Sequence, residues 1–188
     1  MNFSELLKAR RSIRRFEEKD VPTNIIHGII EDSILAPNAG NEQPWKFTIV
    51  NDRSTIKKIS DESKKNILER ICNNPLDYAK KYKGILAKES YNVFYNAPSV
   101  VFIYGDKDKK NLLVDCALAA SYFMFSATSR GLGTCWINLG SEIKDKSMLS
   151  SLQIGETDRI VAPIILGYPD QKPAIPKRDK PVVNIGNF

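Results

Sequence analysis

The sequence predicts a β-sheet with helices packed on its faces. About four short runs of apolar or alternating residues have the length of strands, and five or six other segments have helical periodicity or composition. Of the 188 residues, 42% are hydrophobic and 27% are charged, which is ordinary for a folded domain. These observations predict a single domain over residues 1–188.

The first quarter of the chain is predicted to hold two helices and a strand. Residues 3–11 form a short helix, and residues 12–16 alternate and are extended. Pro22 opens a second helix, whose isoleucines recur with the 3.6-residue period and which stops before Pro37. The loop that follows leads to a strand over residues 45–50, where Trp, Phe and Ile alternate with polar residues.

The next segment is highly charged. Residues 53–92 are expected to be helical with a break around residues 73–75, and most of their charges should form a solvated face. This stretch, and residues 60–92 in particular, carries little chemistry that can be assigned from sequence. Residues 99–104 are a continuous apolar run with the length of a buried strand.

A long apolar helix is predicted over residues 110–130, ended by Gly131. Strands are expected at 134–138 and 159–166, with a short helix at 141–149 between them. The long helix is apolar nearly all round, so it needs partners on every side. We expect a second subunit to cover part of it.

The positive charge gathers at the two ends of the chain. The net charge is +6, of which residues 1–20 carry +2 and residues 171–188 carry +3. If the ends meet in space they form an anion site, and the alternative is two solvated basic termini. The segment 171–188 has no core of its own and needs another surface to lie on.

Several classes of protein are disfavoured. Three widely spaced cysteines, Cys72, Cys116 and Cys135, do not form a disulfide framework, which favours a reducing, cytoplasmic setting. The apolar stretch from 112 to 127 is read as a buried helix, so no membrane partner is expected. Residues 131–170 hold three cations against five acids, which fits one small anion better than nucleic acid.

Two motifs stand out. Arg10, Arg11, Ser12 and Arg14 place guanidinium groups and a hydroxyl within five residues, a donor set suited to phosphate. The segment from Gly131 to Trp136 is not a dinucleotide fingerprint, because it lacks the third glycine and follows a helix into a strand. It is either a tight turn that approaches something flat or a helix cap followed by a strand.

Residues with catalytic chemistry are sparse. His27 has no neighbouring nucleophile or carboxylate in a recognisable pattern, and Cys135 is either a structural thiol or close to a ligand. We find no nucleophile motif, no carboxylate pair and no metal-ligand cluster. If the protein is an enzyme, a bound cofactor should supply the reactivity.

Taken together, these pieces resemble the flavin-dependent nitroreductase family over most of the chain. The matching segments keep the family's order and spacing: Arg10-Arg-Ser-Ile-Arg14-Arg-Phe16, Ala36-Pro-Asn-Ala-Gly-Asn41-Glu-Gln-Pro44-Trp45, Asn96-Ala-Pro98, Gly131-Leu-Gly-Thr-Cys-Trp136-Ile, Gly167-Tyr-Pro169 and a basic tail. The resemblance implies an α+β fold with a mostly antiparallel central sheet flanked by helices. It also implies an intertwined homodimer with FMN at each of two interface sites.

The resemblance assigns cofactor-binding residues in four segments. Arg10, Arg11, Ser12 and Arg14 would bind the FMN phosphate. The loop Pro37, Asn38, Ala39, Gly40 and Asn41 would reach the flavin from the other subunit. Leu132, Gly133 and Thr134 would lie against the flavin ring, and Lys177 and Arg178 of the extended tail, residues 171–188, would close on the phosphate. Residues 60–92 would form a variable helical region near the substrate pocket.

The implied activity is an FMN-dependent oxidoreductase. NADH or NADPH would reduce the flavin, and a nitroaromatic, a quinone or a similar flat, electron-poor acceptor would then be reduced in a ping-pong reaction. A flavin-binding carrier or sensor without turnover is the alternative, and a small basic nucleic-acid-binding domain is a second rival.

Overall fold

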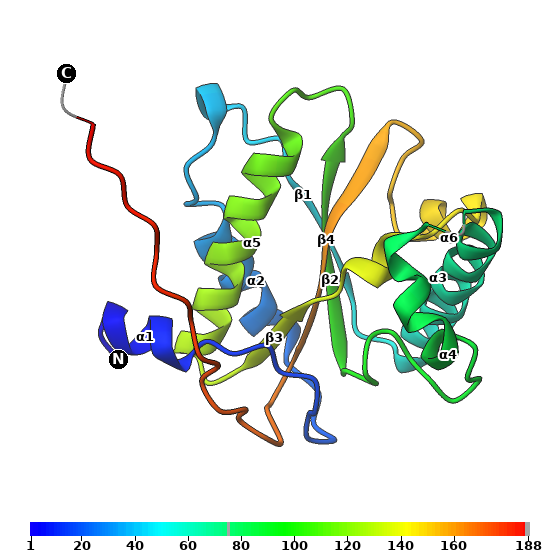
Figure 1. The fold of residues 1–188 in the computed structure, drawn as a ribbon, viewed down its shortest axis with the longest axis horizontal. Helices are drawn as coiled ribbons and strands as arrows, with labels where there is room; N and C mark the ends of the chain where they lie inside the picture. The colour runs from blue at the N-terminus through cyan, green and yellow to red at the C-terminus, as the bar shows by residue number, and fades with distance from the viewer. Residues whose placement is uncertain (75, 187–188) are drawn as a thin grey trace.

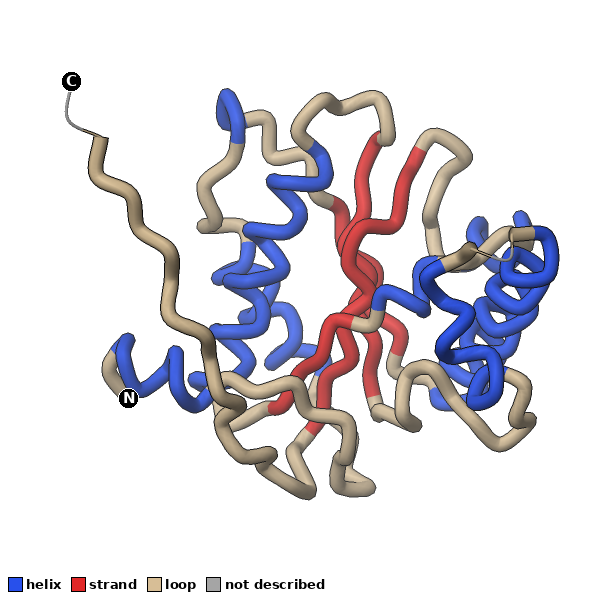
Figure 2. Tube along the Cα trace, in the orientation of Figure 1, coloured by secondary structure: helices blue, strands red, loops and turns tan. Residues whose placement is uncertain are grey.

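The computed structural model describes residues 1–74 and 76–186 and contains a four-stranded sheet between two layers of helices (Figures 1 and 2). The strands are β1 (Lys46–Val50), β2 (Ser99–Asp106), β3 (Gly133–Trp136) and β4 (Asp158–Gly167), in the spatial order β1-β2-β4-β3. Every neighbouring pair is antiparallel. The expected α+β architecture is therefore confirmed.

One face of the sheet carries α2 (Thr23–Ser33) and α5 (Leu112–Ser129), with α1 (Phe3–Ala9) beside them (Figure 1). The side of α5 that packs on the sheet and α2 is fully buried, and most of its side chains are small: Cys116, Ala119, Ala120, Phe123 and Ala127. Its other side is open, since Leu113, Val114 and Tyr122 are 46%, 61% and 41% exposed. By length and composition alone α5 could cross a membrane, but 44% of it is buried in this core.

The opposite face carries α3 (Arg53–Asn73), the 3₁₀ turn η2 (Tyr78–Tyr82), α4 (Lys83–Leu86) and α6 (Lys146–Ser151) (Figure 1). Ile56, Ile59 and Ile67 of α3 pack there against Phe94 and Phe102. The predicted break after α3 is confirmed at Asn73, whereas Pro75 lies outside the described residues.

The expectation of a solvated charged face has one clear exception. The Lys64 side chain is 9% exposed, lies 3.1 Å from Asp61, and donates to the carbonyl oxygens of Lys88, Glu89 and Tyr91. A buried ammonium needs such partners, and these contacts hold the segment after α4 against α3.

Helix bounds differ from expectation in three places. The first helix, expected over residues 3–11, ends at Ala9, because the backbone is already extended at Arg10. The second helix ends at Ser33, earlier than Pro37 requires. The single helix expected at 141–149 is wrong: a 3₁₀ turn, η3 (Asn138–Ser141), comes first, and α6 begins at Lys146. The reason is the N-cap at Asp145, whose carboxylate accepts the Met148 amide at 2.8 Å. The predicted cap at Gly131 is confirmed by its left-handed φ of 79°.

Two extended segments position the site, which we call the arm (residues 10–16) and the tail (residues 171–188, described to 186). The arm follows α1 and runs to β3, where Ser12 pairs with Thr134 in a parallel bridge. The tail leaves β4 through Tyr168 and Pro169 and extends away from the body of the protein (Figure 1). The two ends of the chain therefore meet only where the tail begins, next to the arm, and the rest of the tail extends away from the arm (Figure 1).

Candidate functional site

The arm is bonded to the sheet by its backbone. The Ile13 amide donates to the Thr134 carbonyl at 2.9 Å, and the Glu17 amide donates to the Tyr168 carbonyl at 2.9 Å. Because the arm is extended, successive side chains point to opposite sides. Arg10, Ser12 and Arg14 share one side, and the other side carries Arg11, Ile13 and Arg15.

The first side of the arm opens into a cavity of about 330 Å³, which we call the arm cavity. It is lined by three arm residues, three residues of α5 and two of β3: Arg10, Ser12, Arg14, Ser121, Met124, Phe125, Cys135 and Trp136. None of these is acidic. Within the described part of the chain, the side chains of Arg10 and Arg14 form no hydrogen bond or ion pair, so their guanidinium donors are available to an anion.

The opposite side of the arm holds the tail rather than the cavity. Arg11 donates to the Ala174 carbonyl at 2.8 Å, and Arg15 forms a 3.0 Å ion pair with Asp170. Of the four residues expected at the phosphate, the structure thus brings Arg10, Ser12 and Arg14 together and turns Arg11 away.

The glycine turn supports the arm. Leu132 lies in the core at 4% exposure, and Thr134 is fully buried. A Cβ on Gly133 would lie 2.7 to 2.9 Å from three atoms of the Ile13 side chain. Gly133 is therefore required by the packing of the arm on β3. The next residues along β3, Cys135 and Trp136, line the arm cavity.

The cysteine in this cavity is not set up as a nucleophile. Burial raises the pKa of the Cys135 thiol, although Arg14, Ser12 and Arg10 act in the opposite direction. A thiol with a raised pKa stays protonated near neutral pH and is weakly reactive. His27 is exposed on α2, and within residues 1–74 and 76–186 no group of three His, Cys, Asp or Glu side chains could hold a metal ion.

The loop with Pro37, Asn38, Ala39, Gly40 and Asn41 lies elsewhere. The Ala39 amide donates to the buried Asp115 carboxylate at 3.1 Å, next to the start of α5. Phe125, which lines the arm cavity, is ten residues further along α5, or about 15 Å at the helical rise. One chain therefore does not bring this loop to its own arm cavity (Figure 1).

A second cavity of about 330 Å³, the tyrosine cavity, adjoins the arm cavity and shares Arg14 and Trp136 with it. Its lining is rich in aromatic side chains: Arg14, Tyr78, Tyr82, Ile85, Tyr91, Val93, Tyr95, Trp136, Ile137, Asn138 and Leu139. The Arg14 guanidinium stands 5.7 Å from the centre of the Tyr95 ring.

Two of these tyrosines form a fixed pair. The rings of Tyr91 and Tyr95 meet edge to face at 6.1 Å, with their hydroxyls 3.5 Å apart. Burial first, and the Tyr95 hydroxyl second, raise the pKa of Tyr91, so its hydroxyl remains a proton donor at neutral pH. Sequence reasoning placed a pocket near 60–92 without naming these residues. The four-residue spacings of Tyr78 and Tyr82 and of Tyr91 and Tyr95 were the sequence pattern that could have indicated this aromatic cavity.

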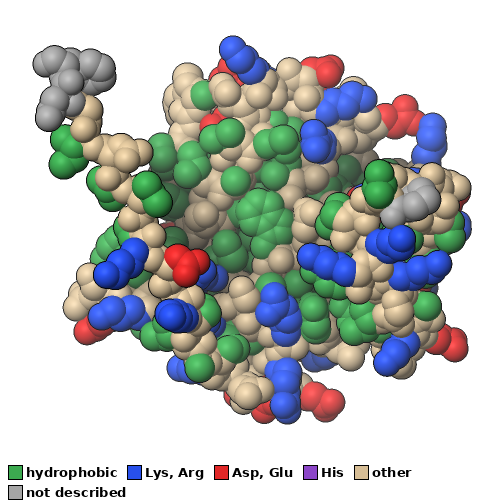
Figure 3. Space-filling model, in the orientation of Figure 1, with side chains coloured by type: hydrophobic (Ala, Val, Ile, Leu, Met, Phe, Trp, Pro, Cys, Tyr) green, Lys and Arg blue, Asp and Glu red, His purple; other side chains and the backbone are tan. Residues whose placement is uncertain are grey.

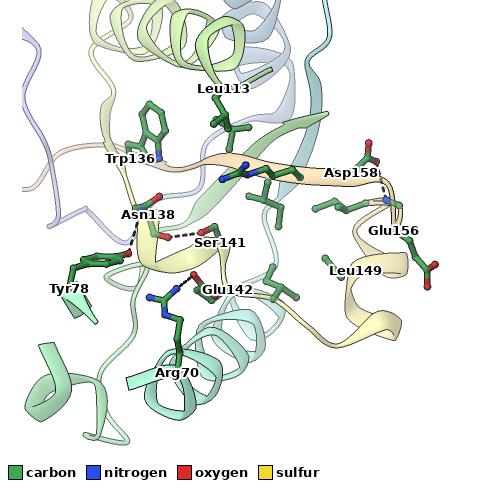
Figure 4. Close-up of a pocket in the computed structure, with 16 residues that line it drawn as sticks. Arg70, Tyr78, Leu113, Trp136, Asn138, Ser141, Glu142, Leu149, Glu156 and Asp158 are labelled. Carbon is green, nitrogen blue, oxygen red and sulfur yellow. Dashed lines mark hydrogen bonds and ion pairs between the residues drawn. The ribbon is translucent and has the colours of Figure 1, made fainter. Parts of the chain in front are cut away.

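A larger cavity of about 640 Å³ continues from the tyrosine cavity past Trp136, Tyr78 and Asn138 (Figure 4). The surface view shows the corresponding hollow between the α5 side and the α3–α4 side of the molecule, with hydrophobic side chains in its floor and basic side chains below it (Figure 3). Lys177 and Arg178 lie on the exposed tail and line none of these three cavities.

Comparison with known proteins finds relatives that cover nearly the whole chain. The chain is 27% identical over 183 residues to the Bacillus subtilis protein named "Putative NAD(P)H nitroreductase YfhC", with 93% of this chain and 88% of that protein covered. A structure of nitroreductase with bound FMN from Bacteroides fragilis superposes with a TM-score of 0.82 at 24% identity, covering all of both chains. An FMN-dependent nitroreductase structure from Clostridium difficile has a TM-score of 0.71 at 26% identity, covering 97% of this chain and 98% of that one.

A further relative has a different activity in its name. Iodotyrosine deiodinase of Thermotoga neapolitana is 23% identical over 188 residues, with 98% of this chain and 97% of that protein covered. Of the structural neighbours named above, the Bacteroides fragilis protein has bound FMN and the Clostridium difficile protein is named as FMN-dependent. The nitroreductase family model matches residues 7–168, and this chain belongs to the nitroreductase family.

Proposed function

We propose that this protein is a homodimeric NAD(P)H-dependent oxidoreductase that uses FMN to reduce nitroaromatics, quinones or similar flat, electron-poor acceptors. The observation that carries the proposal is the arm cavity, where Arg10 and Arg14 point unpaired guanidinium groups at the same space as Ser12. Two cations and a hydroxyl, with no acid in the lining, fit a phosphate monoester.

Each group in the site has a role that its position supports. Arg10, Ser12 and Arg14 bind the phosphate end of FMN. Trp136 and the tyrosines provide flat apolar walls against which a ring can stack. When bound, FMN supplies the hydride chemistry that no side chain here offers.

The second subunit follows from what one chain leaves incomplete. The loop 37–41 lies at the far end of α5 from the arm cavity, and the outward side of α5 exposes Leu113, Val114 and Tyr122. The tail exposes Ile175, Val182, Val183 and Ile185 at 65% to 90%. A second copy packed on α5 would cover these side chains and bring its own loop to the first copy's arm cavity.

An anaerobic titration tests the activity. The purified protein should show flavin absorbance, and NADH or NADPH should bleach it, with colour returning on addition of a quinone or a nitroaromatic. With one aromatic-walled space for both substrates, steady-state kinetics should give parallel lines in double-reciprocal plots. Bound FMN that neither nicotinamide reduces would instead indicate a carrier or sensor, and intersecting lines would mean that donor and acceptor bind together.

A further inference from the structure

Two of the segments that line the tyrosine cavity are far apart in the sequence. Tyr78 and Tyr82 of η2 form one wall, and residues 136–139 at the end of β3 form another. Neither segment is a long element with a stable shape of its own, since η2 has five residues and η3 has four. Something outside them must set the distance between the two walls.

A single guanidinium joins the two segments. Arg70, in the last turn of α3, lies 2.8 Å from the Asp77 carboxylate through Nε and contacts the Glu142 carboxylate through Nη1. Asp77 is the N-cap of η2, where it accepts the Ala79 amide at 2.7 Å, and Glu142 follows directly after η3. We call these two contacts the Arg70 bridge; Figure 4 shows the one to Glu142.

The bridge continues to the cavity through one tyrosine. The Arg70 guanidinium lies 5.5 Å from the centre of the Tyr78 ring, and the Tyr78 hydroxyl accepts the Asn138 side-chain amide at 3.3 Å. Tyr78 and Asn138 both line the tyrosine cavity, whereas Arg70 itself stands behind Tyr78 and lines only the larger cavity. The contacts close a ring that runs through both walls and back to α3.

Helix α3 forms the base of this ring. Glu62, Asn66 and Arg70 occur at four-residue spacing on α3, so they lie on one side of the helix. Asn66 is 3% exposed and donates to the Glu142 carbonyl at 2.8 Å, while Glu62 accepts the Asp145 amide at 3.1 Å. Residues from three successive turns of α3 thus contact the segment that contains η3 and the residues after it. Arg70 also contacts Asp77 and so connects this segment to η2.

We propose that Arg70 is a positioning residue for the electron acceptor, fixing Tyr78 against Asn138 and so setting the shape of the tyrosine cavity. This inference rests on the proposed function, because it assumes that the aromatic acceptor binds in that cavity. The Asp77 side chain is only 7% exposed and that of Arg70 is 30% exposed, so water screens this bridge much less than a surface pair.

The test uses para-nitrobenzoate as the probe in two assays. Its dissociation constant is measured on the oxidised flavoprotein by quenching of tryptophan fluorescence, which needs no turnover, and its Michaelis constant is measured with NAD(P)H as donor. The variants are Arg70→Met, Arg70→Lys, Tyr78→Phe and the double variant Arg70→Met with Tyr78→Phe. Glu69→Gln is the matched control, because it is the neighbouring residue on α3 and its 3.5 Å pair with Lys144 is exposed.

Arg70→Met should raise both the dissociation constant and the Michaelis constant for the probe about tenfold, because Tyr78 and Asn138 would no longer be held in the arrangement that binds the probe. FMN retention and the rate of flavin reduction by NAD(P)H should stay within twofold. Arg70→Lys should restore part of the affinity, since it keeps the charge but not the fork. The double variant should be no worse than Arg70→Met alone, because Arg70 acts through Tyr78.

Other results would overturn the proposal. Unchanged probe affinity in Arg70→Met, or additive effects in the double variant, would remove Arg70 from acceptor positioning. Equal losses of FMN and probe affinity would make the bridge a general structural contact. If Arg70→Met does not fold, Asp77→Asn and Tyr78→Phe decide the question by the same affinity shift. Arg70-dependent probe binding without reduction by NAD(P)H would support the inference and reject the proposed function alone.

Discussion

The two basic ends of the chain behave differently although their composition is alike. The arm lies along β3, with Ile13 4% exposed and its backbone bonded to Thr134. The tail contacts the arm at its base through Arg11 and Ala174, and Asp170, just before the tail, pairs with Arg15. Beyond Ala174 the described side chains of the tail are exposed. The sheet holds the arm, whereas the described part of the tail beyond Ala174 is exposed.

This difference distinguishes the part of the proposed FMN site that one subunit forms alone from the part that would need a second subunit. The arm presents Arg10 and Arg14 in a fixed cavity because the sheet holds it there. The tail combines exposed isoleucine and valine side chains with four cations. Exposing those apolar side chains to water is unfavourable, so a partner surface should cover them. We therefore expect changes in the arm to alter flavin affinity directly, and changes in the tail to act through assembly.

The largest effect should come from deleting residues 171–188. Removing this segment should shift the proposed dimer toward monomer, because the exposed apolar side chains of the tail would no longer add to the interface. Bound FMN should be lost as well, because the second subunit would no longer bring its loop 37–41 to the site. Sedimentation velocity and the ratio of flavin to protein absorbance measure the two effects. A shortened chain that remains a dimer saturated with FMN would show that the tail plays no part in assembly.

The next effect should come from Gly133→Ala in the seat of the arm. The added Cβ would lie 2.7 Å from Ile13, so the arm must move, at a cost of about 1–3 kcal/mol in the free energy of unfolding. FMN affinity should fall as well, because the arm carries Arg10 and Arg14.

Gly131→Ala is the control for this change. Gly131 has the left-handed φ of 79° but no atom within 4 Å of its Cβ position, so alanine there costs backbone strain without a clash. Denaturant unfolding with flavin titration compares the two variants. Equal FMN affinity in both would contradict the role of Gly133 as the seat of the arm.

A third comparison uses two adjacent cations on opposite sides of the arm. Arg14→Ala should weaken FMN binding by about 1.5–3 kcal/mol, or roughly ten- to a hundredfold, because a charge-assisted contact to phosphate is lost. Arg15→Ala should leave FMN affinity nearly unchanged, since Arg15 faces Asp170. Titrations with FMN and with riboflavin, which lacks the phosphate, provide the test. Equal losses for both flavins would mean that Arg14 contacts the flavin ring and not the phosphate, on the side where Arg14 lies over Tyr95.

Much of the fold could be predicted because its signals are local. The isoleucine period of α2, the apolar run of β2 and the glycine after α5 each depend on a few neighbouring residues. The sheet order β1-β2-β4-β3 depends on pairings between distant segments, which no local pattern fixes. The start of α6 was missed because the capping carboxylate of Asp145 sets it, not the apolar pattern.

The site could be predicted only in part, for the same reason. The arm was predicted to be extended, and successive side chains of an extended segment point to opposite sides. That alternation would have shown that Arg11 points away from the side shared by Arg10, Ser12 and Arg14. The neighbour that requires Gly133 to be glycine is Ile13, 120 residues earlier, so the local turn pattern could not reveal it. The tyrosine cavity forms where three separate segments meet, and only the fold brings them together.

The smallest effect should come from Asp170→Asn at the base of the tail. The Arg15–Asp170 pair is short at 3.0 Å, but its side chains are 70% and 46% exposed, so water and salt screen it strongly. The Asp170 amide still donates to the Arg15 carbonyl at 3.1 Å, and the variant retains that backbone bond. We expect the free energy of unfolding to fall by less than about 1 kcal/mol at low salt and by less still at high salt. Asp179→Asn, further along the exposed tail, is the control for a change of one charge. Denaturant unfolding at two salt concentrations measures both variants. A salt-independent loss of several kcal/mol in Asp170→Asn alone would mean that the base of the tail is as firmly held as the arm, and the contrast between the two ends would then begin beyond Ala174.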